Sequence, residues 1–591
     1  MKAIILVLIL FMASCSNDSI VELKSEQIRI KFKNHLTALS PINYIEIFGR
    51  TPSERELALG RNLSNDPILS RNNDVSCATC HLSNHGFADG NSLTVGALGL
   101  GGPSGNDVGK KFSEGKLSID RGLGDDGRGF KANSFMFRNS LSTINVAYRM
   151  NKNKSEGLFH DGRFGSLFFQ TLLPIHTSIE MCGDNPISRK NNLFAEGGVF
   201  FKTKVKLTHV NSFDPYSGRE TGFFNAAHTT IKGVPTMRPN GTLSIPGRNE
   251  CLAIAIAKLK TIPYYRNEFK SIYKSEIKDN LIAIALTAYV STHVSKETAF
   301  DEFVSGENSL TDSQLTGLAL FFTKMGQTVK IGEKVYKGAG CYQCHSGPTF
   351  GGIGYSSLGV KGSQRSPLSR PKFINKRNSS FFGRIKLQRG ELPKCHIEGL
   401  SISREGLAPD MGRASGSFKT DDCFKFRVPP LRNIIETFPY FHHGTALAQD
   451  VSATSYRERS LKGLEQVIRY HLRGPVDHKL FARNNLRQGV FYDKYHQKDF
   501  FIPYFAQNFI STDNNKLNLT ESDIFPINLN DEEVTGLVDF VAYSLWDRKS
   551  TTRGDLGNPL GHPIKVPSGF TPSVTRDIGN QLEIPPNYKI E

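Results

Sequence analysis

Two strings of the same form, Cys77-Ala-Thr-Cys80-His81 and Cys341-Tyr-Gln-Cys344-His345, constrain this chain more than any other feature. In a C-x-x-C-H pentad the two thiols form thioethers with a porphyrin, and the adjacent histidine becomes the proximal iron ligand. A chain of 591 residues with 9 Cys and 16 His would contain about 0.004 such pentads by chance. The alternative interpretations are a zinc knuckle or a pair of disulfides. The repeated pentad favours two covalently bound haem c groups.

The N-terminus has the features of an export signal. Met1-Lys2 precedes an apolar run from Ala3 to Ala13, which is too short to cross a bilayer as a helix. The junction Met12-Ala13-Ser14-Cys15 resembles a bacterial lipobox, which would make Cys15 the lipid-bearing first residue of the mature chain. The alternative is an ordinary cleaved signal with a free cysteine nearby. Either way we expect the chain in the bacterial periplasm or cell envelope, with a lipid anchor in the membrane if Cys15 is modified.

The remaining cysteines and the net charge fit an exported redox protein. With one cysteine assigned to lipid and four to haem, an even number remains, and the oxidising compartment predicts two disulfides. These cysteines are Cys182, Cys251, Cys395 and Cys423, most simply paired 182–251 and 395–423, although three pairings are open. The formal charge of +17 could steer an acidic electron donor or hold the protein against anionic lipid. No basic run is interleaved with aromatic residues, so we expect no nucleic-acid partner.

The pattern along the chain predicts a mainly α fold, with two cytochrome-c-like haem domains and irregular inserts. Apolar residues recur at helical spacing within 252–259, 281–289, 314–322, 463–473 and 531–547. The expected order is a signal peptide over 1–15, a tether over 16–44, a first haem domain over 45–325, a second haem domain over 326–550 and a surface tail over 551–591. The first domain carries an insert at about 187–250, in which a hairpin is expected, and the second carries one at about 361–420.

Further strings surround the pentads in a fixed order. In the first half they are Phe87-Ala-Asp-Gly, Arg138-Asn-Ser-Leu-Ser, Phe159-His-Asp-Gly-Arg and Ser166-Leu-Phe-Phe-Gln. In the second half they are Phe426-Arg-Val-Pro-Pro-Leu-Arg-Asn, Thr437-Phe-Pro-Tyr-Phe-His-His-Gly and Leu464-Glu-Gln-Val-Ile-Arg-Tyr-His. Together with the pentads they resemble the bacterial di-haem cytochrome c peroxidases and their methylamine-utilisation (MauG-type) relatives. The resemblance covers roughly residues 50–185, 252–360 and 424–547.

The resemblance implies different roles for the two haem groups. The N-terminal haem would reduce hydrogen peroxide to water, with Gln170 and Glu180 lining its distal pocket. Because cleavage of peroxide needs a base that moves a proton from one oxygen to the other, we expect Glu180 to act as acid and base. Gln170 would orient the peroxide. The alternative for Glu180 is a surface carboxylate on a loop.

The C-terminal haem would pass electrons, with His345 as its proximal ligand. In the family the distal ligand is Met in the peroxidases and Tyr in the methylamine-utilisation enzyme, and the aligned position here is His471, with Tyr470 beside it. His471 is the expected ligand. The alternatives are Tyr470, or a His471 that is merely a polar residue at the end of an amphipathic helix.

The family also binds a calcium ion between its haem domains, through oxygen ligands that include backbone carbonyls. The matching positions are Asn139, Thr437 and Pro439. The chain departs from the family at His160, where the family has a tryptophan that relays electrons between the haem groups. The only tryptophan of this chain is Trp546. This substitution puts the efficiency of electron transfer between the haem groups in doubt.

The leading hypothesis is therefore a peroxidase that takes electrons from a small exported cytochrome or cupredoxin. One alternative is a MauG-type oxidase that acts on a protein or small molecule. Another is a di-haem electron carrier or sensor without turnover. The resemblance also leaves a homodimer open as an assembly.

Overall fold

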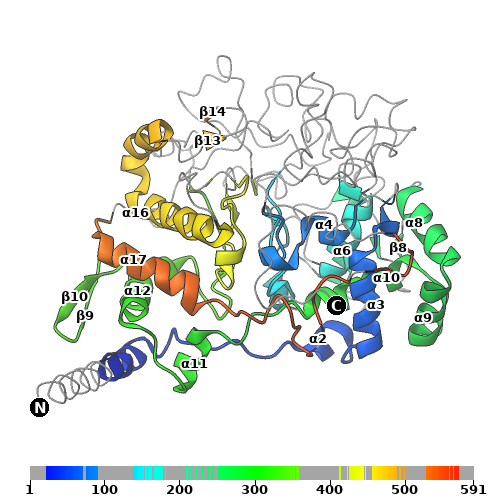
Figure 1. The fold of residues 1–591 in the computed structure, drawn as a ribbon, viewed down its shortest axis with the longest axis horizontal. Helices are drawn as coiled ribbons and strands as arrows, with labels where there is room; N and C mark the ends of the chain where they lie inside the picture. The colour runs from blue at the N-terminus through cyan, green and yellow to red at the C-terminus, as the bar shows by residue number, and fades with distance from the viewer. Residues whose placement is uncertain are drawn as a thin grey trace, which may run out of the picture.

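The computed structural model describes residues 21–70, 73, 75–90, 138–151, 154–155, 157–162, 166–176, 180–181, 250–352, 354–358, 412–413, 422, 425–444, 446, 455–488, 527–557, 559–563 and 565–570, and short strands in the inserts. This part is mainly helical with few strands (Figure 1). Within it, no helix has the length and hydrophobicity needed to cross a membrane. Four residues of the predictions, Cys15, Cys182, Cys395 and Cys423, lie outside the described residues, and of Cys251 only the backbone is described.

The first half of the chain packs around one hydrophobic core, seen on the right of Figure 1. Its elements are α2 (Tyr44–Phe48), α3 (Glu54–Asn65), α4 (Cys77–Cys80), α6 (Leu167–His176), α8 (Glu250–Thr261), α9 (Pro263–Tyr273) and α10 (Asp279–Ser291), with short 3-10 turns η1 (Pro67–Leu69), η2 (Ser83–His85) and η4 (Val146–Arg149). Helix α3 begins at a side-chain cap, because Ser53 Oγ accepts from the Glu56 N–H. It then crosses α10 closely at Gly60, where a Cβ would lie 2.1 Å from the Ala285 carbonyl oxygen.

A second core lies on the left of Figure 1. It is built from a helix over 21–32, α11 (Ala299–Ser305), α12 (Asp312–Phe322), the hairpin β9 (Thr328–Ile331)–β10 (Lys334–Lys337), η7 (Cys341–Gln343), η10 (Ile434–Glu436), α16 (Tyr456–Gln488) and α17 (Asp531–Asp539), which continues into the π-helical turn η12 (Phe540–Ser544). Helices α12 and α17 touch through two glycines, since a Cβ on Gly317 would lie 1.9 Å from the Gly536 carbonyl oxygen. The helices predicted from periodicity are confirmed as α8, α10, α12, α16 and α17.

All strand pairs of the described part are antiparallel and two-stranded. The short pairs are β1 (Met150–Asn151) with β2 (Lys154–Ser155), β11 (Tyr355–Ser356) with β12 (Phe426–Arg427), β13 (Tyr492–Asp493) with β14 (Lys498–Asp499), β3 (Thr208–His209) with β6 (Thr229–Thr230), β4 (Ser212–Phe213) with β5 (Glu220–Thr221), and β7 (Thr236–Met237) with β8 (Leu243–Ser244). The last three pairs lie in the first insert, where the sequence predicted a hairpin.

The division into cores differs from the predicted domain limits. Residues 21–32 are a helix rather than part of a tether, and its Ile28 and Phe32 are buried in the second core. Helices α11 and α12 also pack into the second core, whereas Val294 still belongs to the first. The two cores therefore separate between residues 294 and 300, ahead of the boundary predicted at 325–326. The reason is that α12 buries its apolar face against α17, which lies more than 200 residues later.

Residues 551–570, called the C-terminal strap below, are not the plain surface tail that was predicted. The strap runs from the second core back to the first (Figure 1). There the imidazole of His562 accepts a hydrogen bond from the Ser83 N–H at 3.0 Å, and its other nitrogen bonds to Asn65 Oδ1. Ser568 donates to Asp66 Oδ1 at 2.6 Å, and Tyr289 donates to the Leu560 carbonyl at 3.0 Å. The strap thus fastens the second half of the chain to the loop that follows the first pentad.

The buried His562 predicts a pH dependence of stability. Burial lowers the pKa of His562 to about 3, with a further contribution from Arg61. Below its ordinary value of about 6.5 the unfolded chain binds a proton that the folded chain does not, so stability falls as the pH falls through this window. For this group we expect a loss of about 2 kcal/mol between pH 6.5 and 5.0.

The free energy of unfolding is measured with urea at pH 7 and at pH 5. In H562Q the decrease between the two pH values should be smaller by the contribution of His562. S568A removes a strap hydrogen bond without removing a titrating group, so it should lower stability equally at both pH values. A pH dependence that stays the same in H562Q would contradict the assignment.

Candidate haem-binding sites

Each pentad folds into a single turn that brings its histidine back over its first cysteine. The His81 N–H donates to the Cys77 carbonyl at 3.0 Å in α4, and the His345 N–H donates to the Cys341 carbonyl at 2.8 Å in η7. None of the four pentad cysteines forms a disulfide. Within the described part of the chain, no three His, Cys, Asp or Glu side chains converge on one point as a metal site. The turns hold two thiols and one imidazole together, as thioether attachment to one porphyrin requires.

Both proximal histidines are held in the same tautomer by a backbone carbonyl. His81 Nδ1 lies 2.9 Å from the Phe87 oxygen, and His345 Nδ1 lies 3.1 Å from the Phe350 oxygen. Because a carbonyl only accepts, each Nδ1 carries the proton and each Nε2 keeps its lone pair for iron. Phe87 and Phe350 both have positive φ, 57° and 54°. This backbone conformation recurs at the same point of both loops.

The electrostatic surroundings keep these imidazoles neutral, as metal ligation requires. Burial lowers the pKa of His81, and burial together with the nearby His471 lowers the pKa of His345 to about 4. The residues present therefore fit a haem at both pentads.

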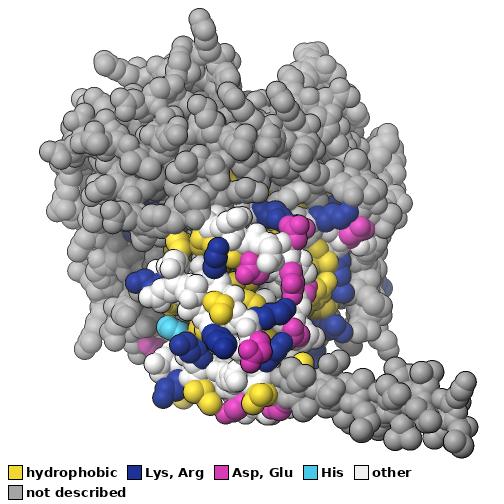
Figure 2. All heavy atoms as spheres, turned by 90° about the vertical axis from the view of Figure 1, so that its left-hand side faces the viewer, with side chains coloured by type: hydrophobic (Ala, Val, Ile, Leu, Met, Phe, Trp, Pro, Cys, Tyr) yellow, Lys and Arg dark blue, Asp and Glu magenta, His cyan; other side chains and the backbone are white. Residues whose placement is uncertain are grey.

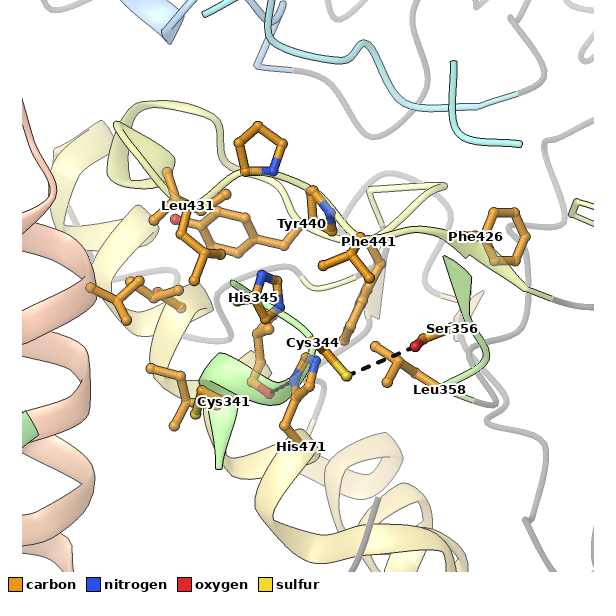
Figure 3. Close-up of a pocket in the computed structure, with 18 of the residues that line it drawn as sticks. Cys341, Cys344, His345, Ser356, Leu358, Phe426, Leu431, Tyr440, Phe441 and His471 are labelled. Carbon is orange, nitrogen blue, oxygen red and sulfur yellow. Dashed lines mark hydrogen bonds between the residues drawn. The ribbon is translucent and has the colours of Figure 1, made fainter. Parts of the chain in front are cut away.

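A cavity of about 280 Å³ lies against the second pentad. Figure 3 shows His345 and His471 in this cavity, the first from the pentad turn and the second from α16. His471 Nδ1 donates to the Val467 carbonyl at 2.7 Å, which leaves its Nε2 with a free lone pair. The remaining wall is largely apolar and includes Leu358, Leu431, Tyr440, Phe441, Leu464 and Ile468. Two imidazoles with available lone pairs thus lie in one apolar cavity.

Tyr470 takes a different place from its neighbour. Its side chain is fully buried, its hydroxyl donates to the Leu358 carbonyl at 2.8 Å, and it does not line the cavity. Burial raises the pKa of this phenol above its ordinary value. A neutral phenol that is already hydrogen-bonded to a carbonyl is a poor ligand for iron.

On the first haem side, the charge of Glu180 reaches Cys77 of the pentad. Burial is the main cause that raises the pKa of the Cys77 thiol to about 11, and the negative charge of Glu180 adds to it. Gln170, on α6, has an amide oxygen that is shielded from solvent and accepts no hydrogen bond from any described residue. A buried acceptor without a partner costs about 1 to 3 kcal/mol. Such an atom is typical of a site that receives a ligand or water.

His160 lies between the two halves of the chain and lines the cavity of the second pentad. Its Nε2–H donates to the Asn139 carbonyl at 2.9 Å, and its own carbonyl accepts from the Arg427 N–H at 2.7 Å. Burial, with the charge of Arg138, lowers the pKa of His160 to about 3. The next residue, Asp161, forms a buried ion pair with Arg138 at 2.7 Å. The His160 imidazole is therefore neutral and held on the Asn139 carbonyl, while the backbone of His160 bonds to the second half of the chain.

The three residues expected at a calcium ion also meet at the cavity wall. Asn139, Thr437 and Pro439 all line it, and Asn139 Nδ2 donates to the Pro439 carbonyl at 3.4 Å. Thr437 Oγ1 donates to the Ile434 carbonyl at 3.0 Å. The structure thus brings Asn139 and Pro439 into direct contact and places Thr437 on the same wall.

Several residues around the sites carried no sequence signal. His293, at the end of α10, stacks on Phe87 with ring centroids 4.0 Å apart, and its Nδ1 bonds to Thr143 Oγ1 at 2.7 Å. It thereby supports the residue whose carbonyl holds His81. In the second half, Arg432 donates to the Pro348 carbonyl at 2.7 Å and to both carboxylate oxygens of Asp301. No spacing rule connects any of these pairs.

Trp546 does not take the place of the missing tryptophan. It does not line the cavity, and its indole N–H donates to Glu436 Oε1 at 3.0 Å. The guanidinium carbons of Arg457 and Arg548 lie 4.1 and 4.7 Å from its ring centroid. Burial raises the pKa of Glu436 to about 7. The indole therefore joins η10 to the end of η12 rather than bridging the pentads.

Comparison with known proteins finds similarity to one family. A family model described as di-haem cytochrome c peroxidase matches residues 54–198 and 218–309, which include the first pentad but not the second. The cytochrome c551 peroxidase of Nitrosomonas europaea is 29% identical over 195 residues, which cover 33% of this chain and 42% of that protein. The chain thus spans less than half the length of this relative.

Two other relatives align over more than two thirds of this chain. The cytochrome c551 peroxidase of Pseudomonas aeruginosa is 23% identical over 68% of this chain and 72% of its own length. The methylamine utilization protein MauG of Paracoccus denitrificans is 23% identical over 74% of this chain and 84% of its own. A solved structure titled as a MauG-like protein associated with microbial copper homeostasis aligns over 88% of this chain and 97% of its own, with 17% identity and a TM-score of 0.46. Over the residues that the family model matches, the chain is thus similar to the di-haem cytochrome c peroxidases.

Proposed function

We propose that this protein reduces hydrogen peroxide to water at the first pentad, with electrons that enter at the second. The observation that carries the proposal is the inequality of the two sites. The second cavity holds two imidazoles with available lone pairs, whereas Gln170, on α6 in the first half of the chain, has a buried amide oxygen without a described partner. A site with two strong ligands moves electrons, and a site with an open position binds small molecules.

In this proposal the protein groups have separate tasks. When bound, the first haem would supply an iron that can bind peroxide and be reduced. The overall change, H2O2 + 2 e⁻ + 2 H⁺ → 2 H2O, takes its electrons from the second site and its protons from solvent. Glu180 takes the proton from one peroxide oxygen and returns it to the other, which then leaves as water. Gln170 orients the peroxide through its amide. His81 stays neutral and keeps its Nδ1–H on the Phe87 carbonyl, so that its Nε2 remains a ligand.

We further infer an exported protein that is lipid-anchored at Cys15 and receives single electrons from a small cytochrome or cupredoxin. The basic net charge of +17 suits an acidic donor. A calcium ion at Asn139, Thr437 and Pro439 would require the Asn139 amide to rotate, so that Oδ1 rather than Nδ2 faces the Pro439 carbonyl.

The function is tested with purified holoprotein that carries both haem groups. The protein is reduced by one electron, peroxide is added, and the spectrum and the turnover with a reduced cytochrome are followed. Stoichiometric oxidation of two cytochromes per peroxide supports the peroxidase. Consumption of peroxide without oxidation of the cytochrome, accompanied by oxidation of another protein or a small molecule, would indicate the MauG-type oxidase. No reaction with peroxide would leave an electron carrier.

The distal ligand of the second site gives a separate prediction. We propose His471, because it shares the cavity with His345 and its Nε2 is available. H471M should raise the reduction potential of one haem by about 100 mV or more and change its spectrum, because methionine ligation favours the reduced iron. A redox titration followed by absorbance measures both. Y470F is the matched control, and a spectrum that changes in Y470F but not in H471M would contradict the assignment.

A further inference from the structure

The helix over 21–32 has apolar residues on two opposite faces. Ile28 and Phe32 face the second core and are buried. Leu23 and Ile30, seven residues apart and therefore on one face, are 63% and 64% exposed. The inward face is explained by packing, but the outward face has no such explanation within the described part of the chain.

The hairpin β9–β10 contacts this helix at its turn and carries a further exposed aliphatic side chain. Gln27 lies between Leu23 and Ile30 on the helix, and its side chain accepts a hydrogen bond from the Gly332 N–H at 3.0 Å, at the hairpin turn. On the next strand, Val335 is 62% exposed. Four large hydrophobic side chains of the described part are more than 60% exposed, and three of them are Leu23, Ile30 and Val335. These three are called the aliphatic corner below.

Basic side chains surround the aliphatic corner. Segments 21–34 and 324–337 together contain eight Lys and Arg but three Glu. Exposed lysines of these segments that form no ion pair with any described residue are Lys31, Lys33, Lys324, Lys330 and Lys337. Figure 2 shows this side of the molecule, where hydrophobic side chains are interspersed with Lys and Arg and with some Asp and Glu. Lysines with long apolar stems beside exposed aliphatic groups suit the boundary between lipid headgroups and acyl chains.

We propose that the aliphatic corner and its lysines rest on the surface of an anionic membrane. Leu23, Ile30 and Val335 would enter the headgroup region, and the lysines would contact lipid phosphates. The helix begins no later than residue 21, a few residues after Cys15. This inference rests on the proposed lipid anchor. A lipid on Cys15 would hold this face within reach of the bilayer.

An acidic protein is the competing occupant, and two observations favour the membrane. The most exposed groups of the corner are aliphatic, whereas protein interfaces favour aromatic and arginine side chains. The corner also joins the segment nearest to Cys15. His35, just beyond the helix, packs on Tyr342 of the second pentad with ring centroids 4.7 Å apart, so the segment that follows the helix is in contact with that pentad.

The experiment uses mature holoprotein from residue 16 onward, exported with an ordinary cleavable signal, so that no lipid masks the contact. Co-sedimentation is measured with phosphatidylcholine vesicles, with and without about 30 mol% phosphatidylglycerol. The L23S/I30S/V335S variant should bind the anionic vesicles about tenfold or more weakly than the parent protein. The matched control I45S/L556S/F570S removes exposed hydrophobic side chains elsewhere and should stay within about twofold. Haem spectra and melting curves verify that all variants are folded.

Equal binding of the parent and the corner variant, or no binding to anionic vesicles, overturns the proposal. Loss of binding to an acidic cytochrome in the corner variant, with vesicle binding unchanged, assigns the corner to a protein partner instead. Palmitate labelling of the full chain reports separately on the anchor at Cys15. A failure of the anchor and a failure of the membrane contact are therefore distinguishable, and neither depends on peroxide turnover.

Discussion

Replacing Glu180 by glutamine is expected to lower kcat/KM for hydrogen peroxide by about 10²- to 10⁴-fold, the usual contribution of a general acid–base group. Glutamine keeps the size of the side chain and can still form hydrogen bonds, but it cannot accept the peroxide proton. The negative charge of Glu180 contributes to the raised pKa of the Cys77 thiol in the first pentad. The measurement is the rate of cytochrome oxidation at several peroxide concentrations.

Two controls separate this effect from a structural one. E276Q removes a carboxylate whose side chain is 85% exposed and should leave the rate unchanged. E180D keeps a carboxylate at a shorter reach and should recover part of the rate. If E180Q oxidises the cytochrome as fast as the parent protein, Glu180 is a surface carboxylate and the acid–base assignment is wrong.

Features set by covalent chemistry or by short spacing could be predicted from the sequence. The pentads require both thiols and the histidine within one turn, and α4 and η7 provide this. Helical periodicity located α8, α10 and α12 because each buries a face whose pattern is visible within a dozen residues. His471, which lines the cavity, was singled out by the family resemblance and not by a local pattern.

Features set by contacts between distant segments could not be predicted in this way. His562 meets Ser83 across 479 residues and Arg432 meets Asp301 across 131 residues, and no local pattern connects such pairs. The helix over 21–32 had a signal that was overlooked, since Val21, Ser25, Ile28 and Phe32 follow helical spacing. The roles of Phe87 and Phe350 depend on a positive φ, which few non-glycine residues adopt.

Replacing Asp301 by asparagine is expected to lower the free energy of unfolding by about 3 to 5 kcal/mol, because it leaves a buried charge without its partner. The Arg432 side chain is fully buried and donates to both carboxylate oxygens of Asp301, at 2.6 and 2.7 Å. The same carboxylate caps α11, where it accepts from the N–H and the hydroxyl of Thr298. Denaturant unfolding measures the change, and E302Q, in the same helical turn, should cost less than about 1 kcal/mol.

The effect of D301N should come mainly from the unpaired guanidinium rather than from the lost helix cap. In R432M the buried charge is removed together with its need for a partner, so the double variant D301N/R432M should be more stable than the sum of the two single losses predicts. If the loss of unfolding free energy in the double variant equals the sum of the two single losses, the unpaired guanidinium is not the cause. Arg432 also lies over the Phe350 ring, 5.8 Å from its centroid, and the Phe350 carbonyl holds His345. D301N should therefore shift the absorbance of the haem at the second pentad and leave that of the first unchanged.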